Sequence, residues 1–217
     1  MCIRDSLADG GCPVALMAGD LALAARFTAL LEDHTRSNAL DVWSSYAECF
    51  RGELLIRVGE TEAGLRLLRR AAATLERSGF VLYRTAFLAA LALGYADAQR
   101  PDEGLEAVQI ALDHCRRTGE AWCKPELIRI RGTLWLQQGD AAAAEACFRQ
   151  SLTDAQQQGA LSWALRTATD LARLLQAAGR ELEATTVLAP VYGRFTEGFG
   201  SPDLTSARTL LAALPTL

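Results

Sequence analysis

Apolar residues recur every three or four positions along most of this chain, with polar residues between them. The stretch from Trp43 to Val58 shows the pattern clearly, and a second apolar stripe runs from Leu65 to Leu75. Spacing of this kind predicts two amphipathic helices. Gly59 supplies the left-handed residue that ends the first helix, and Thr61 is expected to cap the second. The segment therefore predicts two helices joined by a tight turn.

The same pattern returns every forty residues without a gap in the alignment. The tight turn falls at one repeated position: Gly19-Asp20, Gly59-Glu60, Gln99-Arg100, Gly139-Asp140 and Gly179-Arg180. The turn that ends a unit falls at another: Gly79, Gly119 and Gly159. A fixed period in this range is the signature of a solenoid, in which each unit buries its apolar face against its neighbours. The register predicts a partial unit at 7–39 and full units at 40–79, 80–119, 120–159 and 160–200.

The carboxy-terminal part departs from this pattern. Pro190 interrupts the second helix of the last unit and is expected to kink it. Ser201-Pro202-Asp203 then predicts a new helix that ends near Leu214. A terminal helix of a solenoid needs a polar outer face, so we interpret 201–217 as a capping helix. The residues expected on its outer face are Asp203, Thr205, Ser206, Arg208 and Thr209.

The first six residues differ in kind from the rest. Residues 1–6 resemble a translated transposon end of the sort used to build sequencing libraries. We therefore expect 1–6 to be a non-native leader and the natural chain to continue upstream. The register agrees, because 7–18 behaves as the middle of a unit.

Composition narrows the function classes. Half of the residues are apolar and 22% are charged, which is the balance of a soluble globular chain. A net charge of −4 argues against direct nucleic-acid binding, which normally needs a basic surface. The longest apolar run, Ala86 to Ala96, is too short to cross a bilayer. No secretory signal is visible at the start. We expect a cytoplasmic protein without membrane contact.

The motifs of common catalytic and cofactor sites are missing from the sequence. The single lysine, Lys124, lies in Cys-Lys-Pro, which is not a phosphate-binding loop. No Cys-x-x-Cys pair or other zinc spacing is present. His114 and Cys115 are adjacent on a predicted helix, so their side chains diverge by about 100° and cannot act together. We expect no enzyme activity, no cofactor and no metal, and we interpret the six cysteines as reduced structural residues.

One unit carries a recognisable family pattern. Its small, aromatic and turn residues have the spacing of the tetratricopeptide repeat (TPR): Gly132, Trp135, Gly139, Ala144 and Phe148. Two other units repeat the pattern with substitutions, at Gly52, Leu55, Gly59, Gly64 and Leu68, and at Ala92, Tyr95, Gly104, Val108 and Ala111. The period of forty is longer than that of the family. The resemblance implies an all-α, right-handed TPR-like α-solenoid of about five helical hairpins with a capping helix.

Longer strings resemble a more specific group: Cys12–Leu16, Gly64–Arg69, Leu127–Gly132, Ser162–Arg166 and Ala189–Phe199. They are similar to the carboxy-terminal repeats of bacterial multidomain regulators. In that group a winged-helix DNA-binding or nucleotide-cyclase domain precedes an AAA-type ATPase and then the repeats. The resemblance implies that this chain is a sensor or partner-binding tail. It assigns no ATPase, cyclase or DNA-binding activity to this segment.

The resemblance also implies a binding surface, because the first helix of each TPR unit lines the concave groove. Carried over by register, the groove positions are Tyr46, Cys49, Glu53, Arg57, Ala86, Ala89, Leu93, Asp97, Glu126, Arg129, Thr133, Gln137, Arg166, Thr169, Arg173 and Gln176. The candidate partner-binding residues among them are Tyr46, Glu53, Arg57, Glu126, Arg129, Arg166, Thr169 and Arg173.

Two interpretations of the arginines remain open. Arg129, Arg166 and Arg173 are expected near one another, and arginine forks suit the carboxylates of a peptide or an acidic ligand. The alternative is that they are ordinary surface arginines paired with Glu126 or Asp170.

The repeated aromatic residues pose a similar choice. Trp43, Tyr83 and Trp163 form either a ladder for ligand stacking or a packing wedge between units, and packing is the better supported. Trp122 is expected to be partly exposed. Tyr95 and Trp135 are expected in the core.

Two functional hypotheses follow. The first is a non-catalytic protein-interaction or effector-sensing domain, the carboxy-terminal regulatory tail of a bacterial ATPase-type regulator, with a protein, a peptide or a small effector as its partner. The second is a freestanding adaptor or self-associating scaffold.

Overall fold

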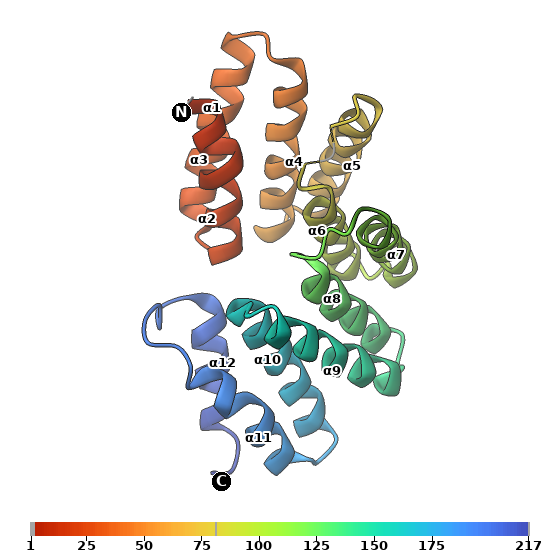
Figure 1. Cartoon of the computed structure of the whole chain (residues 1–217), viewed down its shortest axis with the longest axis vertical. Coiled ribbons are helices and arrows are strands. Elements are labelled where there is room, and N and C mark those ends of the chain that lie inside the picture. The colour runs from red at the N-terminus through yellow and green to blue at the C-terminus, as the bar shows by residue number, and fades with distance from the viewer. Residues whose placement is uncertain (1–2, 81, 217) are drawn as a thin grey trace. The chain divides into compact units, whose positions relative to one another are not determined.

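The computed structural model describes residues 3–80 and 82–216, and every regular element in these residues is a helix (Figure 1). The described residues form two compact units, one up to Ala107 and one from Val108 onward. Residues 1 and 2 of the predicted leader and residue 217 of the predicted cap lie outside the described residues. The all-α prediction is confirmed.

Helical hairpins build the unit up to Ala107 (Figure 1). Its helices are α1 (Ile3–Asp5), a π-helical turn (Ser6–Gly11), α2 (Cys12–Ala18), α3 (Leu21–Ser37), α4 (Asp41–Arg57), α5 (Thr61–Arg77), α6 (Arg84–Asp97) and the start of α7 (Pro101–Thr118). From α2 to α6, each helix contacts the next, and α4 also contacts α2 and α6. The first helices of successive hairpins therefore pack side by side, as a repeat array requires.

The unit from Val108 onward repeats this arrangement. After the end of α7 it contains α8 (Lys124–Gln137), α9 (Ala141–Gln157), α10 (Leu161–Ala177), α11 (Glu181–Tyr192) and α12 (Pro202–Ala212). Helix α10 contacts α8, α9, α11 and α12. It forms the centre of this unit, and its buried residues include Leu165, Leu171 and Leu175.

The turns lie where the sequence predicts them, and Gly59 has the predicted positive φ of 91°. Asp140 caps α9 by accepting a hydrogen bond from the backbone N–H of Ala143 at 2.8 Å. The cap predicted at Thr61 is wrong. Glu60 occupies the cap position of α5, and its side chain makes no capping hydrogen bond.

Glycines let the two helices of a hairpin approach closely, as the TPR-like pattern implies. A Cβ atom built on Gly64 would lie 2.6 Å from the carbonyl oxygen of Gly52 and 2.8 Å from the backbone nitrogen of Ile56. A Cβ built on Gly52 would lie 2.8 Å from the backbone nitrogen of Leu68. Only glycine fits α4 and α5 at this separation.

The core of the first unit is largely aromatic. Tyr46 and Phe50 are buried, and their rings meet edge to face with centroids 5.0 Å apart. Phe80 and Phe87 pack on Tyr46 with centroids at 5.3 and 5.6 Å. Edge-to-face pairs of this kind add to the free energy gained from burial.

The final helices differ from the regular hairpins. Helix α11 contains Pro190 and ends two residues later, at Tyr192. Helix α12 buries Leu204, Ala207 and Leu210. Of the residues predicted on its outer face, Thr205, Arg208 and Thr209 are exposed, whereas Asp203 and Ser206 are partly buried.

Candidate functional site

The predicted arginine cluster forms around α8 and α10. Arg129 donates from Nε and Nη2 to the two carboxylate oxygens of Glu126, each at 2.7 Å. Its Nη1 donates to Oδ2 of Asp170 at 2.6 Å. Because Glu126 and Arg129 belong to α8 and Asp170 to α10, the guanidinium ties the first helices of two successive hairpins together.

Arg166 and Arg173 extend the same network to α12. Nε of Arg166 donates to Oδ2 of Asp203 at 2.6 Å, and its Nη1 lies 3.5 Å from Oε1 of Glu126. Arg173 pairs with Asp170 at 3.3 Å and donates to the hydroxyl of Ser206 at 2.5 Å. All three arginines therefore have carboxylate partners within the molecule.

Positive and negative side chains are equal in number in this network. Three arginines face three carboxylates: Glu126, Asp170 and Asp203. Burial alone would lower the pKa of Arg129, but the ion pairs with Glu126 and Asp170 outweigh it and raise this pKa. The side chain of Arg129 is 12% exposed and that of Arg173 is 54% exposed. An external carboxylate would meet Arg173 first.

The remaining predicted site residues are placed less favourably for binding. Thr169 is buried and donates its hydroxyl hydrogen bond to the backbone oxygen of Leu165 at 2.8 Å. Arg57 pairs with the nearly buried Glu53 at 2.8 Å, one turn away on α4. Both interactions are made within a single helix.

Tyr46 does not present its side chain to a partner in this structure, which corrects its prediction as a groove residue. It is 0% exposed because the surrounding aromatic rings cover it. Its hydroxyl has no hydrogen-bond partner among the described residues, and burial raises its pKa. The register cannot predict which neighbouring rings close over a helix face.

The aromatic residues at the repeated wedge position pack, as the better-supported interpretation has it. Trp43 and Tyr83 pack against the first core and Trp163 against the second. Trp122 is 37% exposed and Tyr95 is buried, as predicted. Trp135 is partly buried and packs against the second core.

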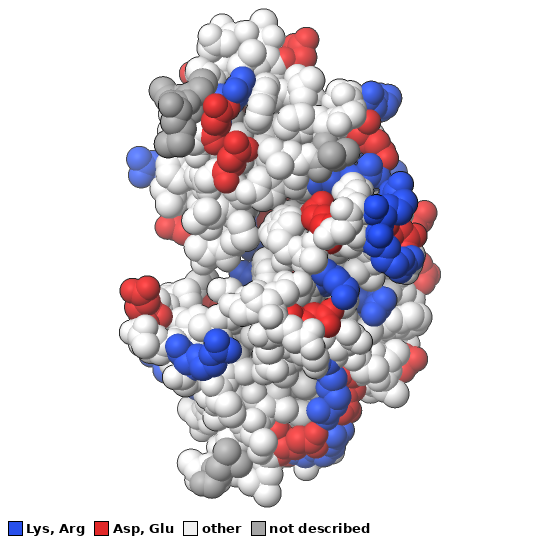
Figure 2. Space-filling view, viewed as in Figure 1, with Lys and Arg blue, Asp and Glu red and all other residues white. Residues whose placement is uncertain are grey.

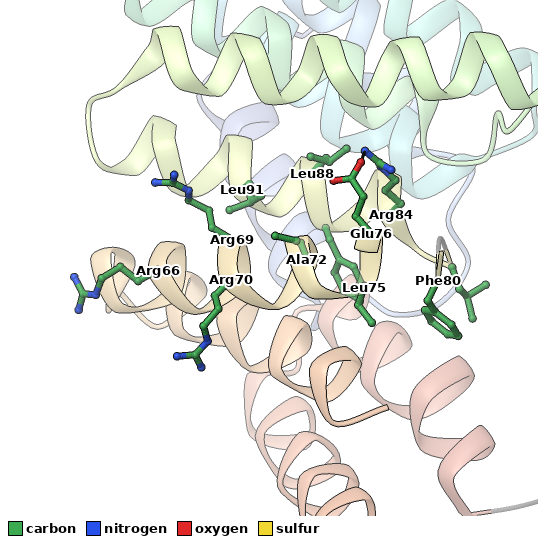
Figure 3. A pocket seen from close by; sticks show the side chains of 13 residues that line it. Arg66, Arg69, Arg70, Ala72, Leu75, Glu76, Phe80, Arg84, Leu88 and Leu91 are labelled. Carbon is green, nitrogen blue, oxygen red and sulfur yellow. Dashed lines mark hydrogen bonds and ion pairs between the residues drawn. The ribbon is translucent and has the colours of Figure 1, made fainter. Parts of the chain in front are cut away.

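A second candidate surface was not anticipated from the sequence. A cavity of about 560 Å³ lies between α5 and α6 (Figure 3). The residues that form its apolar lining include Ala72, Leu75, Phe80, Phe87, Leu88 and Leu91. Arg66, Arg69 and Arg70 of α5 border it at one end, and the ion pair between Arg84 and Glu76 borders it at the other, at 2.5 Å.

A related cavity of about 430 Å³ lies between α7 and α8. Its lining repeats that of the first cavity at an offset of forty residues: Leu112, Cys115, Arg116, Glu120, Lys124, Ile128 and Arg131 correspond to Ala72, Leu75, Glu76, Phe80, Arg84, Leu88 and Leu91. The sequence signal that could have found both cavities is this repeat, read across the junction between units.

Other chemistry is sparse in the described residues. No group of three histidine, cysteine, aspartate or glutamate side chains there is arranged to hold a metal ion. Cys12, Cys49, Cys115 and Cys147 are free, buried thiols. Burial raises the pKa of Cys12 to about 11, which makes its thiol unreactive at neutral pH. Among the described helices, none is long and apolar enough to cross a membrane.

On the face drawn in Figure 2, acidic and basic side chains lie close to one another and neither sign covers the surface alone. This mixed surface accords with the net charge of −4.

Comparison with known proteins identifies the fold but no family. No protein-family model and no curated protein sequence matches this chain. The chain is similar in structure to a Rap protein solved in complex with competence and sporulation factor, with a TM-score of 0.72 and 15% sequence identity. The match covers 90% of this chain and 52% of the Rap protein, so the chain spans about half of that protein's length. The likeness confirms a TPR-like array of helical hairpins.

Proposed function

We propose that this chain is a non-catalytic protein-interaction module in which successive helical hairpins present a surface to a partner protein. The observation that carries the proposal is the likeness of its fold to a Rap protein solved in complex with competence and sporulation factor. Stacked helical repeats offer extended surfaces assembled from neighbouring units, and such surfaces suit protein contacts.

The first helices of the hairpins supply the chemistry of this surface in the unit from Val108. Gln137 and Arg173 are exposed on α8 and α10, whereas Arg129 and Arg166 are held by carboxylates beneath them. We assign direct contacts to the exposed side chains. The buried ion pairs hold α8, α10 and α12 in the arrangement that the partner meets.

We further propose that the module is the carboxy-terminal regulatory part of a larger bacterial ATPase-type transcriptional regulator or signalling protein. The support is the resemblance of strings such as Ala189–Phe199 to the repeats of those regulators. Partner binding would act by biasing two alternative packings of neighbouring hairpins.

A site-specific photo-crosslinker tests the interaction module. A benzophenone amino acid replaces Arg173 in cells of the natural host, and the same group at Arg208, which is exposed on the outer face of α12, is the matched control. We expect one protein adduct at position 173 and none at 208. Equal labelling at both positions, or none at either, would contradict an interaction surface on α8 and α10.

Genomic DNA across the codon for Leu7 tests the regulator context separately. We expect an open frame that continues upstream into further repeats, a phosphate-binding loop and a DNA-binding or cyclase domain. A ribosome-binding site and start codon directly before Leu7 would instead favour a freestanding adaptor or scaffold.

A further inference from the structure

The two cavities occur where the first helix of a hairpin starts late. Helices α6 and α8 have 14 residues each, whereas α4 and α10 have 17 residues each. By the forty-residue register, α6 and α8 begin three residues later than α4 and α10. The missing first turn leaves the end of the preceding helix uncovered, and a groove opens there.

The junction between α9 and α10 shows the contrast. Helix α10 begins one turn earlier in the register, at Leu161. Ala155, Ala164 and Ala168 stand at the positions that Leu75, Arg84 and Leu88 occupy at the first groove, and all three alanines are buried. Small residues and a complete first turn let α9 and α10 pack directly, in contrast to the two junctions that hold the cavities.

The groove between α5 and α6 has a definite chemical character. Its floor is apolar along its length, with buried Leu75, Phe87 and Leu91. Arg66 and Arg69 are both exposed, and among the described residues neither makes a hydrogen bond or ion pair, although Arg69 lies near enough to Glu103 to help lower the pKa of that carboxyl. An apolar floor beside exposed cations is complementary to a partner that carries apolar and acidic groups together.

The shape of the groove favours a protein segment over a compact ligand. The lining residues on α5 run from Arg66 to Glu76, a span of eleven residues that rises by about 15 Å along the helix. The three arginines lie at one end and the neutral pair of Arg84 with Glu76 at the other (Figure 3). An amphipathic helix lies along such a groove with its apolar face down.

We propose that the α5–α6 groove binds an acidic amphipathic helix of a partner protein. Apolar side chains of that helix pack on Leu75, Leu88 and Leu91, and its carboxylates pair with Arg66 and Arg69. This inference rests on the proposed interaction function and names a second surface for it, separate from the positions on α8 and α10.

The repeat-related cavity between α7 and α8 gives the selectivity of this surface. Arg116, Glu120 and Arg131 replace the Glu76, Phe80 and Leu91 of the first groove, so its lining is more polar than that of the α5–α6 groove. An apolar helix face gains little binding free energy from polar lining residues, because these residues would lose their water without gaining hydrogen-bond partners. The same partner helix is therefore expected to select the α5–α6 groove.

Fluorescence anisotropy with a synthetic probe tests the proposal. The probe is a fluorescein-labelled amphipathic helix of about four turns, with leucines on one face and glutamates flanking them. A second probe carries lysines in place of the glutamates. We expect the acidic probe to bind the full chain and to shift the NMR signals of the Leu88 and Leu91 methyl groups. The basic probe is expected to bind at least about tenfold more weakly.

Charge-reversed variants locate the contact. Arg66→Glu/Arg69→Glu changes two exposed residues and is expected to weaken binding of the acidic probe about tenfold or more. Arg26→Glu/Arg208→Glu is the matched control, since both arginines are exposed and Arg26 occupies the position of Arg66 one repeat earlier. The control is expected to bind the probe like the wild-type chain.

Each other outcome overturns the proposal. Equal binding of the two probes, or equal weakening by the two double variants, would mean that charge at this groove does not select the partner. Displacement of the probe by decanoate at the Leu88 and Leu91 methyl groups would assign the groove to a small apolar acid. The crosslinking at position 173 is independent of these results, so failure here leaves the proposed function separately testable.

Discussion

At the scale of single residues, close helix packing depends on two glycines and on one buried cation. Gly52 and Gly64 face each other across α4 and α5, where a Cβ would meet backbone atoms that cannot move aside. Arg129 joins α8 to α10 through two carboxylates. The residue type at each of these positions depends on the atoms that face it from another helix.

Replacing Gly64 by alanine tests the close approach. We expect Gly64→Ala to lower the free energy of unfolding by about 1–3 kcal/mol, because the added methyl group forces α4 and α5 apart. Urea unfolding measures this change. Gly200→Ala is the control, since a Cβ there meets nothing within 4 Å, and it should change stability by less than about 0.5 kcal/mol. Equal effects at the two sites would contradict the packing argument.

Replacing Arg129 tests the buried network. Arg129→Met removes the two hydrogen bonds that Arg129 donates to the buried carboxylate of Glu126, and Nη1 of Arg166 lies 3.5 Å from that carboxylate. We expect a loss of about 3–5 kcal/mol in the free energy of unfolding, measured in urea. Arg173→Ala removes a largely exposed arginine and should cost less than about 1 kcal/mol. The network would be unimportant if the two variants were equally stable.

At the scale of helices and turns, a residue with positive φ ends a helix every twenty residues. From Gly19 to Gly179, nine turn positions all have positive φ, and seven of them are glycine. Ala39 and Gln99 are the other two, with φ of 52° and 57°. A residue with a Cβ is strained in this conformation.

The strain at Ala39 gives a prediction of increased stability. We expect Ala39→Gly to raise the free energy of unfolding by about 0.5–1 kcal/mol, because relief of strain exceeds the extra flexibility of the unfolded chain. Thermal unfolding measures it. The reverse change, Gly179→Ala, should destabilise by a similar amount. A destabilising Ala39→Gly would show that the alanine is not strained.

Helices α9 and α11 are linked by ion pairs that depend on pH. Glu145 accepts from Arg180 at 2.8 Å and from Arg149 at 2.7 Å, and both interactions hold its pKa below the ordinary 4.5. A lowered acid pKa contributes stability above about pH 4.5, and this contribution is lost as the pH falls through the lowered value.

We therefore expect Glu145→Gln to lower the Tm by about 1–3 °C at pH 7, with a difference from the wild-type chain that disappears in acid. Glu197→Gln is the control, because Glu197 is exposed and no ion pair of it is found in the described residues. Thermal unfolding from pH 7 to pH 3 measures both variants. A difference that persists at the acid end would have another cause than these ion pairs.

At the scale of the whole molecule, each hairpin is supported by its neighbours rather than by one central core. The aromatic cluster around Tyr46 and the cluster around Phe148 and Leu171 are separate. In a repeat array, damage to one interface is felt mainly by adjacent repeats.

Phe148→Ala tests this locality. Phe148 is 1% exposed, and its loss is expected to cost about 3–5 kcal/mol. Hydrogen exchange should increase in α8, α9 and α10 and stay unchanged around Tyr46 and Phe50. A uniform increase along the chain would instead show that the repeats open together.

Local patterns in the sequence were sufficient for the fold. The period of forty residues, the apolar spacing and the turn glycines predict the helical hairpins, including the turn at Gln99 where glycine is absent. These signals lie within a few residues of each other, and the steric limits on φ act locally. The close approach at Gly52 and Gly64 also follows from the family spacing, because small residues at facing positions recur with the repeat.

Only the tertiary structure decided what the surface can do. Arg129 pairs with Asp170, forty-one residues away, and Arg166 pairs with Asp203, thirty-seven residues away. The sequence could not show which arginines are held in ion pairs within the molecule and which are exposed to a partner. Tyr46 is covered by Phe80 and Phe87 from the next hairpin. The α5–α6 groove lies where α6 starts a turn late in the register. Burial and ion pairing depend on side chains that meet across helices, and periodicity along one helix carries no information about them.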